Sequence, residues 1–94
     1  MQGEHRTVQA RISGRVQGVG YRVWTRGEAM RLGLTGWVRN ESDGSVSTLI
    51  AGDAAAVATM IERLWQGPHG AAVSKVEIEE MAHDEALADF RIIP

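Results

Sequence analysis

The sequence predicts an α+β domain of the ferredoxin-like class, a split βαβ arrangement with two helices on one face of an antiparallel sheet. Stretches in which apolar and polar residues alternate, as in strands, are interrupted twice by stretches with helical periodicity. The resulting order is β-α-β-β-α-β with a short C-terminal strand. No linker or low-complexity tract interrupts the 94 residues, so we expect residues 1–94 to form a single domain.

The first strand and the first helix are expected in the N-terminal third of the chain. Apolar and polar residues alternate from Val8 to Ser13, as in a half-buried strand. Helical periodicity follows from Tyr21 to Leu32, and Gly33 occupies the position of a helix C-terminal glycine. The residues expected on the buried face of this helix are Val23, Gly27, Met30 and Leu34. Since Gly27 costs about 1 kcal/mol relative to alanine, we expect it to permit close packing against the sheet.

A hairpin and a second helix are expected next. Thr35 to Asn40 and Val46 to Ala51 have the character of strands, and the turn between them contains the Asp43-Gly44 pair. Gly52-Asp53 then supplies a turn and a helix N-cap. The apolar face of the second helix is expected at Val57, Met60, Ile61, Leu64 and Trp65. Gly67-Pro68 ends this helix. The last two strands are expected around Val76 and Ile78 and around Phe90 and Ile92.

Composition and charge exclude several classes of protein. A net charge of −2 and a pI near 5.9 argue against a general nucleic-acid binder, which usually presents a basic face. The chain has no cysteine, and His5, His69 and His83 lack the spacing of metal ligands, so we expect no metal and no cofactor. No apolar run approaches the roughly 18 residues that cross a bilayer, and the N-terminus has no signal-peptide character. We therefore expect a cytoplasmic protein without a membrane partner.

The segment from Ile12 to Arg22 combines features that favour an anion site. It runs from a strand through three glycines, Gly14, Gly18 and Gly20, into a helix. Such a junction directs backbone amides outward at a helix N-terminus, where they can bind an anion. Arg22 lies in the first turn of that helix, where a cation opposes the macrodipole. A bound anion would compensate for this placement, and a guanidinium can hold two phosphate oxygens at once.

Each of these residues also has a purely structural interpretation. The glycines could form only a tight strand-to-helix turn, and Arg22 could be a solvated helix residue. Asn40 could be a turn residue that bonds its own backbone, or an amide that holds a water by donating and accepting. A nucleotide site is disfavoured, because the loop has neither a Gly-Lys-Ser/Thr ending nor the third glycine of a dinucleotide fingerprint. These alternatives stay open at the level of the residues.

Two motifs resemble those of the acylphosphatase family. The first is Ile12-x-Gly14-x-Val16-Gln17-Gly18-Val19-x-Tyr21-Arg22. The second is Gly36-Trp37-Val38-Arg39-Asn40, followed at matching spacing by Gly44-x-Val46 and Gly52. Gly67-Pro68 and Phe90-Arg91-Ile92 extend the resemblance over nearly the whole chain. Tyr21 stands where the family more often has Phe, and Ser47 where many members have a charged or bulkier residue.

The resemblance implies a ferredoxin-like fold and metal-independent hydrolysis of acyl phosphates to a carboxylate and inorganic phosphate. Arg22 would be the phosphate-binding arginine, and Asn40 would orient the attacking water. The backbone amides of the loop would hold the phosphoryl oxygens, and the loop residues are Arg15, Val16, Gln17, Gly18, Val19, Gly20 and Tyr21. Neither motif contains a His, Asp or Glu that must act as general base, so we expect the substrate's own phosphate to take the proton of the water.

Other functions on the same fold make different demands. A phosphate-binding regulatory module would keep the anion site but would have little use for a water-orienting Asn40. A detached N-terminal domain of a carbamoyl-transferring maturation enzyme would continue into cysteine-rich zinc segments, which this sequence lacks. An RNA-binding domain would need aromatic residues in its central strands with basic flanks, and the chain has one Phe and one Tyr. We expect an enzyme that is tolerant of the acyl group, and a monomer.

Overall fold

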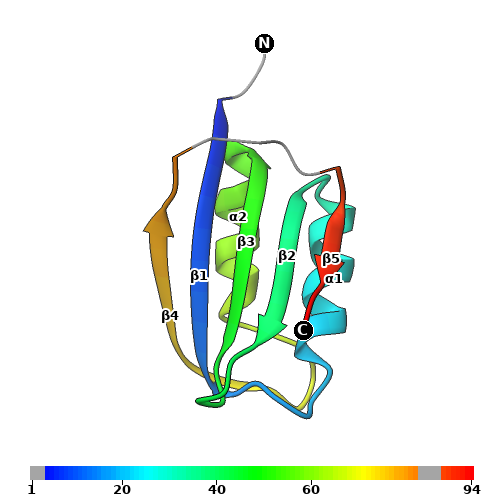
Figure 1. Ribbon diagram of the computed structural model, residues 1–94, viewed down its shortest axis with the longest axis vertical. Helices are drawn as coiled ribbons and strands as arrows, with labels where there is room; N and C mark the ends of the chain where they lie inside the picture. The colour runs from blue at the N-terminus through cyan, green and yellow to red at the C-terminus, as the bar shows by residue number, and fades with distance from the viewer. Residues whose placement is uncertain (1–3, 83–87) are drawn as a thin grey trace.

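The computed structural model describes residues 4–82 and 88–94. Its elements follow the predicted order, and the short last strand is present. They are β1 (His5–Arg15), α1 (Tyr21–Arg31), β2 (Thr35–Asn40), β3 (Val46–Asp53), α2 (Ala54–Leu64), β4 (Ala72–Glu80) and β5 (Phe90–Ile92). The predicted ferredoxin-like architecture is confirmed, and both helices lie behind the same face of the sheet (Figure 1).

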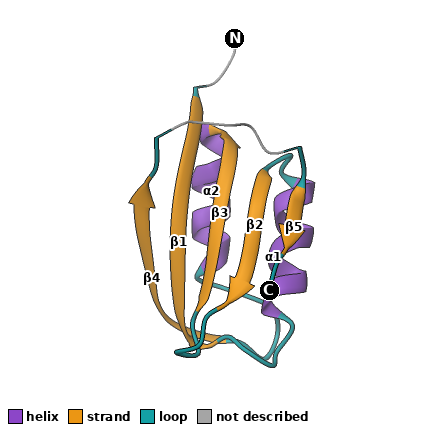
Figure 2. Ribbon diagram, viewed as in Figure 1, coloured by secondary structure: helices purple, strands orange, loops and turns teal. Residues whose placement is uncertain are grey.

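The five strands form one sheet in the order β4-β1-β3-β2-β5 (Figure 2). The first four pair antiparallel, as predicted, whereas β5 pairs parallel to β2 and makes the sheet mixed at that edge. In the β2–β3 hairpin, Asn40 is the partner of Val46, so the turn begins directly after Asn40. This register places Asn40 at one end of the sheet.

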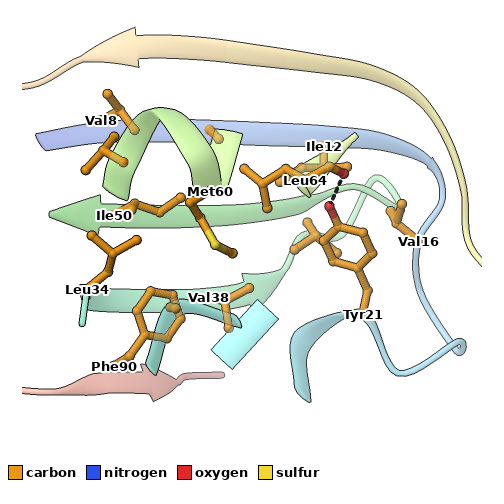
Figure 3. Close-up of a cluster of buried hydrophobic side chains, with 14 residues drawn as sticks. Val8, Ile12, Val16, Tyr21, Leu34, Val38, Ile50, Met60, Leu64 and Phe90 are labelled. Atoms are coloured by element: carbon orange, nitrogen blue, oxygen red, sulfur yellow. Dashed lines mark hydrogen bonds between the residues drawn. The ribbon is translucent and has the colours of Figure 1, made fainter. Parts of the chain in front are cut away.

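The core lies between the sheet and the two helices. Strand alternation directs Val8 and Ile12 of β1 and Ile50 of β3 to this face, and each is fully buried. From α2 the buried residues are Val57, Met60 and Leu64. Figure 3 shows Met60 and Leu64 within this core. The predicted apolar face of α2 is thus confirmed for these residues. Trp65 does not belong to it, since it follows the helix and is 50% exposed.

The buried face of α1 differs from the expected one. Its buried residues are Tyr21, Thr25, Glu28 and Ala29. Val23 and Met30 are 69% and 56% exposed, and a Cβ on Gly27 would meet nothing within 4 Å, so the expected packing of Gly27 against the sheet was wrong. The prediction assumed that the buried face would be apolar, but two polar side chains are buried there because each has a hydrogen-bond partner. The Thr25 hydroxyl donates to the Tyr21 carbonyl at 2.8 Å, and Glu28 accepts from Arg63 of α2 at 2.8 Å.

The C-terminal end of α1 follows the prediction. Gly33 lies just past the helix with φ 72°. The Gly33 amide donates to the Met30 carbonyl and the Leu34 amide to the Ala29 carbonyl, the two bonds of a Schellman motif. This geometry turns Leu34 into the core, where it is 3% exposed. Leu34 is therefore buried as expected, through the helix end and not through a helical stripe.

One end of the sheet brings together segments that are distant in sequence. The β1–α1 loop, the β2–β3 turn and the α2–β4 connection all lie at the lower end of the molecule in Figure 1. The N-terminus of α1 and the last residue of β2, Asn40, open on the same end. Within residues 4–82 and 88–94, no helix is long and apolar enough to cross a membrane.

Candidate active site

The loop of residues 16–20 leads into α1, and its backbone amides are available to bind a ligand. Gly18 and Gly20 have φ of 76° and 81°, in the left-handed region that other residues rarely adopt. Gly20 is the N-cap of α1 and provides no side chain to bond the first-turn amides. No carbonyl or side chain of the described residues accepts a hydrogen bond from the amides of residues 16–23. A run of unpaired amides at a helix N-terminus is suited to binding an anion.

Arg22 is the cation at this helix end. Most arginines of the chain donate to a carboxylate or a carbonyl, such as Arg26 to the Phe90 carbonyl and Arg63 to Glu28. Among residues 4–82 and 88–94, Arg15 and Arg22 are the arginines for which the structure shows no acceptor. Arg22 is half-buried at the positive end of the α1 dipole, so a bound anion would relieve an unfavourable placement.

A hollow of about 100 Å³ joins the loop, the helix start and β2. It is lined by Val16, Gln17, Gly18, Gly20, Tyr21, Arg22, Val23 and Asn40. The structure thus brings together most of the residues expected from the sequence. Arg15 and Val19 do not line it: Arg15 is the exposed last residue of β1, and Val19 packs against the core. Sequence reasoning missed Val23, because it placed this residue on the buried helix face.

Asn40 contributes a buried polar atom without a partner. Strand alternation puts its side chain on the same face as buried Val38, where the core gives way to the hollow. Its Oδ1 is buried, and no described residue donates a hydrogen bond to it. An unsatisfied buried polar atom costs about 1–3 kcal/mol, so this oxygen is placed to accept from a molecule in the hollow, such as a water.

The loop is held from two sides. On one side, Gln17 Nε2 donates to the Glu41 and Ser45 carbonyls of the β2–β3 turn at 2.8 and 2.9 Å. On the other, the buried Tyr21 hydroxyl donates to the Leu64 carbonyl at the end of α2 at 2.6 Å (Figure 3). Burial raises the pKa of Tyr21, which keeps the hydroxyl protonated as a donor. These bonds tie the loop to the β2–β3 turn on one side and to the end of α2 on the other.

The β2–β3 turn is itself ordered by polar contacts. Asp43 accepts from the Ser45 amide at 2.9 Å and from the Ser45 hydroxyl at 2.6 Å, and Arg11 donates to it at 2.8 Å. The Ser45 hydroxyl, ahead of the other causes, lowers the pKa of Asp43. Arg39 likewise lowers the pKa of Glu41 by donating to its carboxylate. The turn that follows Asn40 therefore has a defined conformation at neutral pH.

In the part of the chain that the structure describes, no side chain with the character of a general base or a metal ligand lines the hollow. None of its lining residues is His, Asp, Glu or Cys. His69 is exposed on the α2–β4 connection, His5 lies in β1, and His83 lies outside the described residues. Among residues 4–82 and 88–94, no group of three or more His, Cys, Asp or Glu is arranged to hold a metal ion. The hollow offers backbone hydrogen-bond donors, one cation, Arg22, and two side-chain amides, Gln17 and Asn40.

The comparisons with known proteins identify the family of this chain. The model of the acylphosphatase family matches residues 8–92, which include the loop, Arg22 and Asn40. The chain belongs to the acylphosphatase family. Its sequence is 63% identical to the acylphosphatase of Mesorhizobium japonicum over 93 residues, which is 99% of each chain. That relative therefore resembles this chain over its own full length, as a family member of the same size.

Solved acylphosphatases have the same fold. An acylphosphatase from Coxiella burnetii superposes with a TM-score of 0.90 at 40% identity, covering 95% of this chain and 93% of that one. An acylphosphatase from Bacillus subtilis superposes with a TM-score of 0.92 at 31% identity, covering 95% and 99%. The resemblance noted from the two sequence motifs is confirmed. The Tyr21 departure now has a structural role, because its hydroxyl bonds α2.

Proposed function

We propose that this chain hydrolyses acyl phosphates to a carboxylate and inorganic phosphate, with the phosphoryl group on the loop amides and Arg22. Family membership makes the enzyme an acylphosphatase, and the hollow supports the assignment of roles. The observation that carries these roles is the buried, unpartnered Asn40 Oδ1 in the same hollow as Arg22 and the unpaired amides. An anion site alone would not need an amide oriented in this way.

Binding of the phosphoryl group uses charge and preorganised donors. The amides of residues 16–23 lack acceptors within the described part of the chain, so they can donate to phosphoryl oxygens without breaking existing bonds. The guanidinium of Arg22 can bind two oxygens at once and neutralise their charge. Donors aimed at the charge of a transition state contribute about 3–4 kcal/mol each, because they need no reorganisation during the reaction.

Asn40 would position the nucleophile. Its Oδ1 accepts a hydrogen bond from a water in the hollow, which leaves a lone pair of the water oxygen directed at phosphorus. The water oxygen forms the new P–O bond, and the bond from phosphorus to the acyl oxygen breaks with its electron pair leaving on the carboxylate. A phosphoryl oxygen of the substrate takes the proton of the water. A carboxylate is a good leaving group, so no general acid is required.

The hollow accounts for the phosphate end of the substrate and leaves the acyl group at its rim. Val23 is the strongly exposed apolar side chain that lines it. We therefore propose that the enzyme accepts acyl groups of different size, with Val23 as an apolar contact. Single-domain organisation, a monomeric state and a cytoplasmic location complete this proposal, and they rest on the sequence.

Hydrolysis of benzoyl phosphate in excess EDTA tests the roles. We expect metal-independent turnover by the wild type and a loss of kcat/KM of about 100-fold or more in Arg22→Ala and in Asn40→Ala. Arg22→Ala should weaken the binding of inorganic phosphate, whereas Asn40→Ala should mainly lower kcat. Arg91→Ala, which removes an exposed arginine paired with Asp89, is the matched control and should behave like the wild type.

Two results would contradict the proposal. Turnover that survives in both folded variants would remove Arg22 and Asn40 from the mechanism. A folded wild type that binds inorganic phosphate through Arg22 but turns nothing over would instead indicate a phosphate-binding module. Circular dichroism of each variant separates these results from a failure to fold.

A further inference from the structure

The side chain of Gln17 connects the two halves of the site. Its Nε2 donates to the Glu41 carbonyl at 2.8 Å and to the Ser45 carbonyl at 2.9 Å. Glu41 directly follows Asn40, and Ser45 directly precedes Val46, the strand partner of Asn40. Both donors of one amide group are thus used on the two ends of the turn that begins at Asn40.

In the described part of the chain, the structure shows no other hydrogen bond between the loop of residues 16–20 and the turn of residues 41–45. Other hydrogen bonds of the turn lie within it, such as the bond from the Glu41 amide to the Ser45 carbonyl at 2.8 Å. Gln17 is half-buried, and it lines the hollow together with Asn40 and Arg22. Its side chain therefore links the loop that carries the free amides to the turn at the end of β2.

We propose that Gln17 is a positioning residue, which aligns the water held by Asn40 with the phosphoryl group held by the loop. The inference rests on the proposed function. In-line attack requires the water and phosphorus to be placed together, and a displacement of about 1 Å can cost about 100-fold in rate. The loop binds the phosphoryl group and β2 carries Asn40, so the element that joins them controls this alignment.

Gln17→Met tests the inference, because methionine has a similar length and no hydrogen-bond donor. We expect kcat for benzoyl phosphate to fall by about 10- to 100-fold. The KM and the inhibition constant of inorganic phosphate should stay within about threefold, because the amides and Arg22 are retained. Gln9→Met, which removes an amide from the middle of β1, is the matched control and should keep the wild-type kcat.

A double-mutant cycle with Asn40→Ala separates positioning from a merely structural role. If Gln17 acts through Asn40, Gln17→Met should cost at most about twofold more once Asn40 is alanine. Additive losses in the cycle, or an equal weakening of phosphate binding and of kcat/KM, would overturn the inference. Failure of the proposed function is distinguishable, because Asn40→Ala alone would then leave kcat unchanged.

A shorter variant covers a failure of Gln17→Met to fold. Gln17→Asn keeps both donors but shortens the side chain by one methylene, so it cannot reach both carbonyls from the same backbone position. The same cycle with Asn40→Ala then applies, with the same expected and contradicting results. Thermal unfolding of each variant shows that the activities compare folded proteins.

Discussion

The two helices have the same length, but only α2 follows the usual preferences for helix caps and an apolar buried face. Each has 11 residues. The α2 helix is capped by Asp53, which accepts from the Ala55 amide at 3.2 Å, and it buries only apolar residues: Val57, Met60 and Leu64. The α1 helix has Gly20 as its N-cap and no side-chain cap, carries Arg22 in its first turn, and leaves Val23 and Met30 exposed.

The missing cap and the polar buried face of α1 each have a cause in the tertiary structure. The α2 helix packs on the sheet, so its cap and its apolar stripe agree with its position. The N-terminus of α1 faces the hollow, where a side-chain cap would occupy the amides that the proposed function assigns to the phosphoryl group. Its buried face is polar for another reason, since Glu28 accepts from Arg63 and links α1 to α2. Both departures become intelligible only when α1 is placed among its neighbours.

The largest expected effect is on the free energy of unfolding, and it distinguishes the buried methionine of α2 from the exposed methionine of α1. Met60 of α2 is fully buried, whereas Met30 of α1 is 56% exposed. Met60→Ala should lower the free energy of unfolding by about 2–5 kcal/mol, because it leaves a cavity. Met30→Ala should change it by less than about 0.5 kcal/mol. Urea unfolding of the two variants measures both values, and similar losses would show that Met30 is packed in solution.

A second variant gives α1 the cap that α2 already has. Gly20→Asp places a carboxylate beside the unpaired amides, where it would bond them and repel a phosphoryl group. We expect kcat/KM for benzoyl phosphate to fall by about 10- to 100-fold, which is about 1.4–2.7 kcal/mol of transition-state stabilisation.

Gly20→Asn is the control for the Gly20 variant. It has a similar size and tolerates positive φ to a similar degree, but it carries no charge. It should therefore lose less activity than Gly20→Asp at equal stability. Equal losses of activity in the two variants would attribute the effect to the backbone of Gly20 and not to competition for the amides.

A smaller effect is expected from the hydroxyl that joins the two helices. Tyr21→Phe leaves the buried ring in place and removes the donor to the Leu64 carbonyl. We expect a loss of about 1 kcal/mol in the free energy of unfolding, because a buried carbonyl loses its partner. The kcat should stay within about threefold, since the hydroxyl donates to the Leu64 carbonyl and has no part in the proposed reaction. A large loss of kcat at unchanged stability would assign the hydroxyl to the chemistry.

The smallest expected effect is the loss of stability in acid that arises from the β2–β3 turn, which Gln17 bonds to the loop before α1. Hydrogen bonds lower the folded-state pKa of Asp43 and Glu41, chiefly from Ser45 and Arg39. The stabilisation is thus fully present above the unfolded pKa values of about 4 and is lost as the pH falls through the lower folded values. Asp43→Asn should make the decline in melting temperature between about pH 5 and pH 2 shallower than in the wild type. An unchanged slope would show that Asp43 contributes nothing.

Sequence reasoning succeeded where local and global preferences agree. The strands, the Asp53 cap, the apolar residues of α2 and the glycine after α1 follow from periodicity and end signals that act within a few residues. It failed for the face of α1, because the partner that permits burial of Glu28 is Arg63, 35 residues further along the chain. It also missed the exposed position of Val23, which a helical wheel through Tyr21, Thr25 and Ala29 would have indicated.

The candidate site divides in the same way. The sequence by itself determined the family, the order of elements, the glycine loop and the identities of Arg22 and Asn40, because motif spacing and residue chemistry are local properties. Only the tertiary structure decided that Asn40 Oδ1 is buried without a partner, that Arg22 pairs with no described acceptor, and that Gln17 joins the loop to the β2–β3 turn. These facts depend on strand register and helix docking, which bring residues distant in sequence to one end of the sheet.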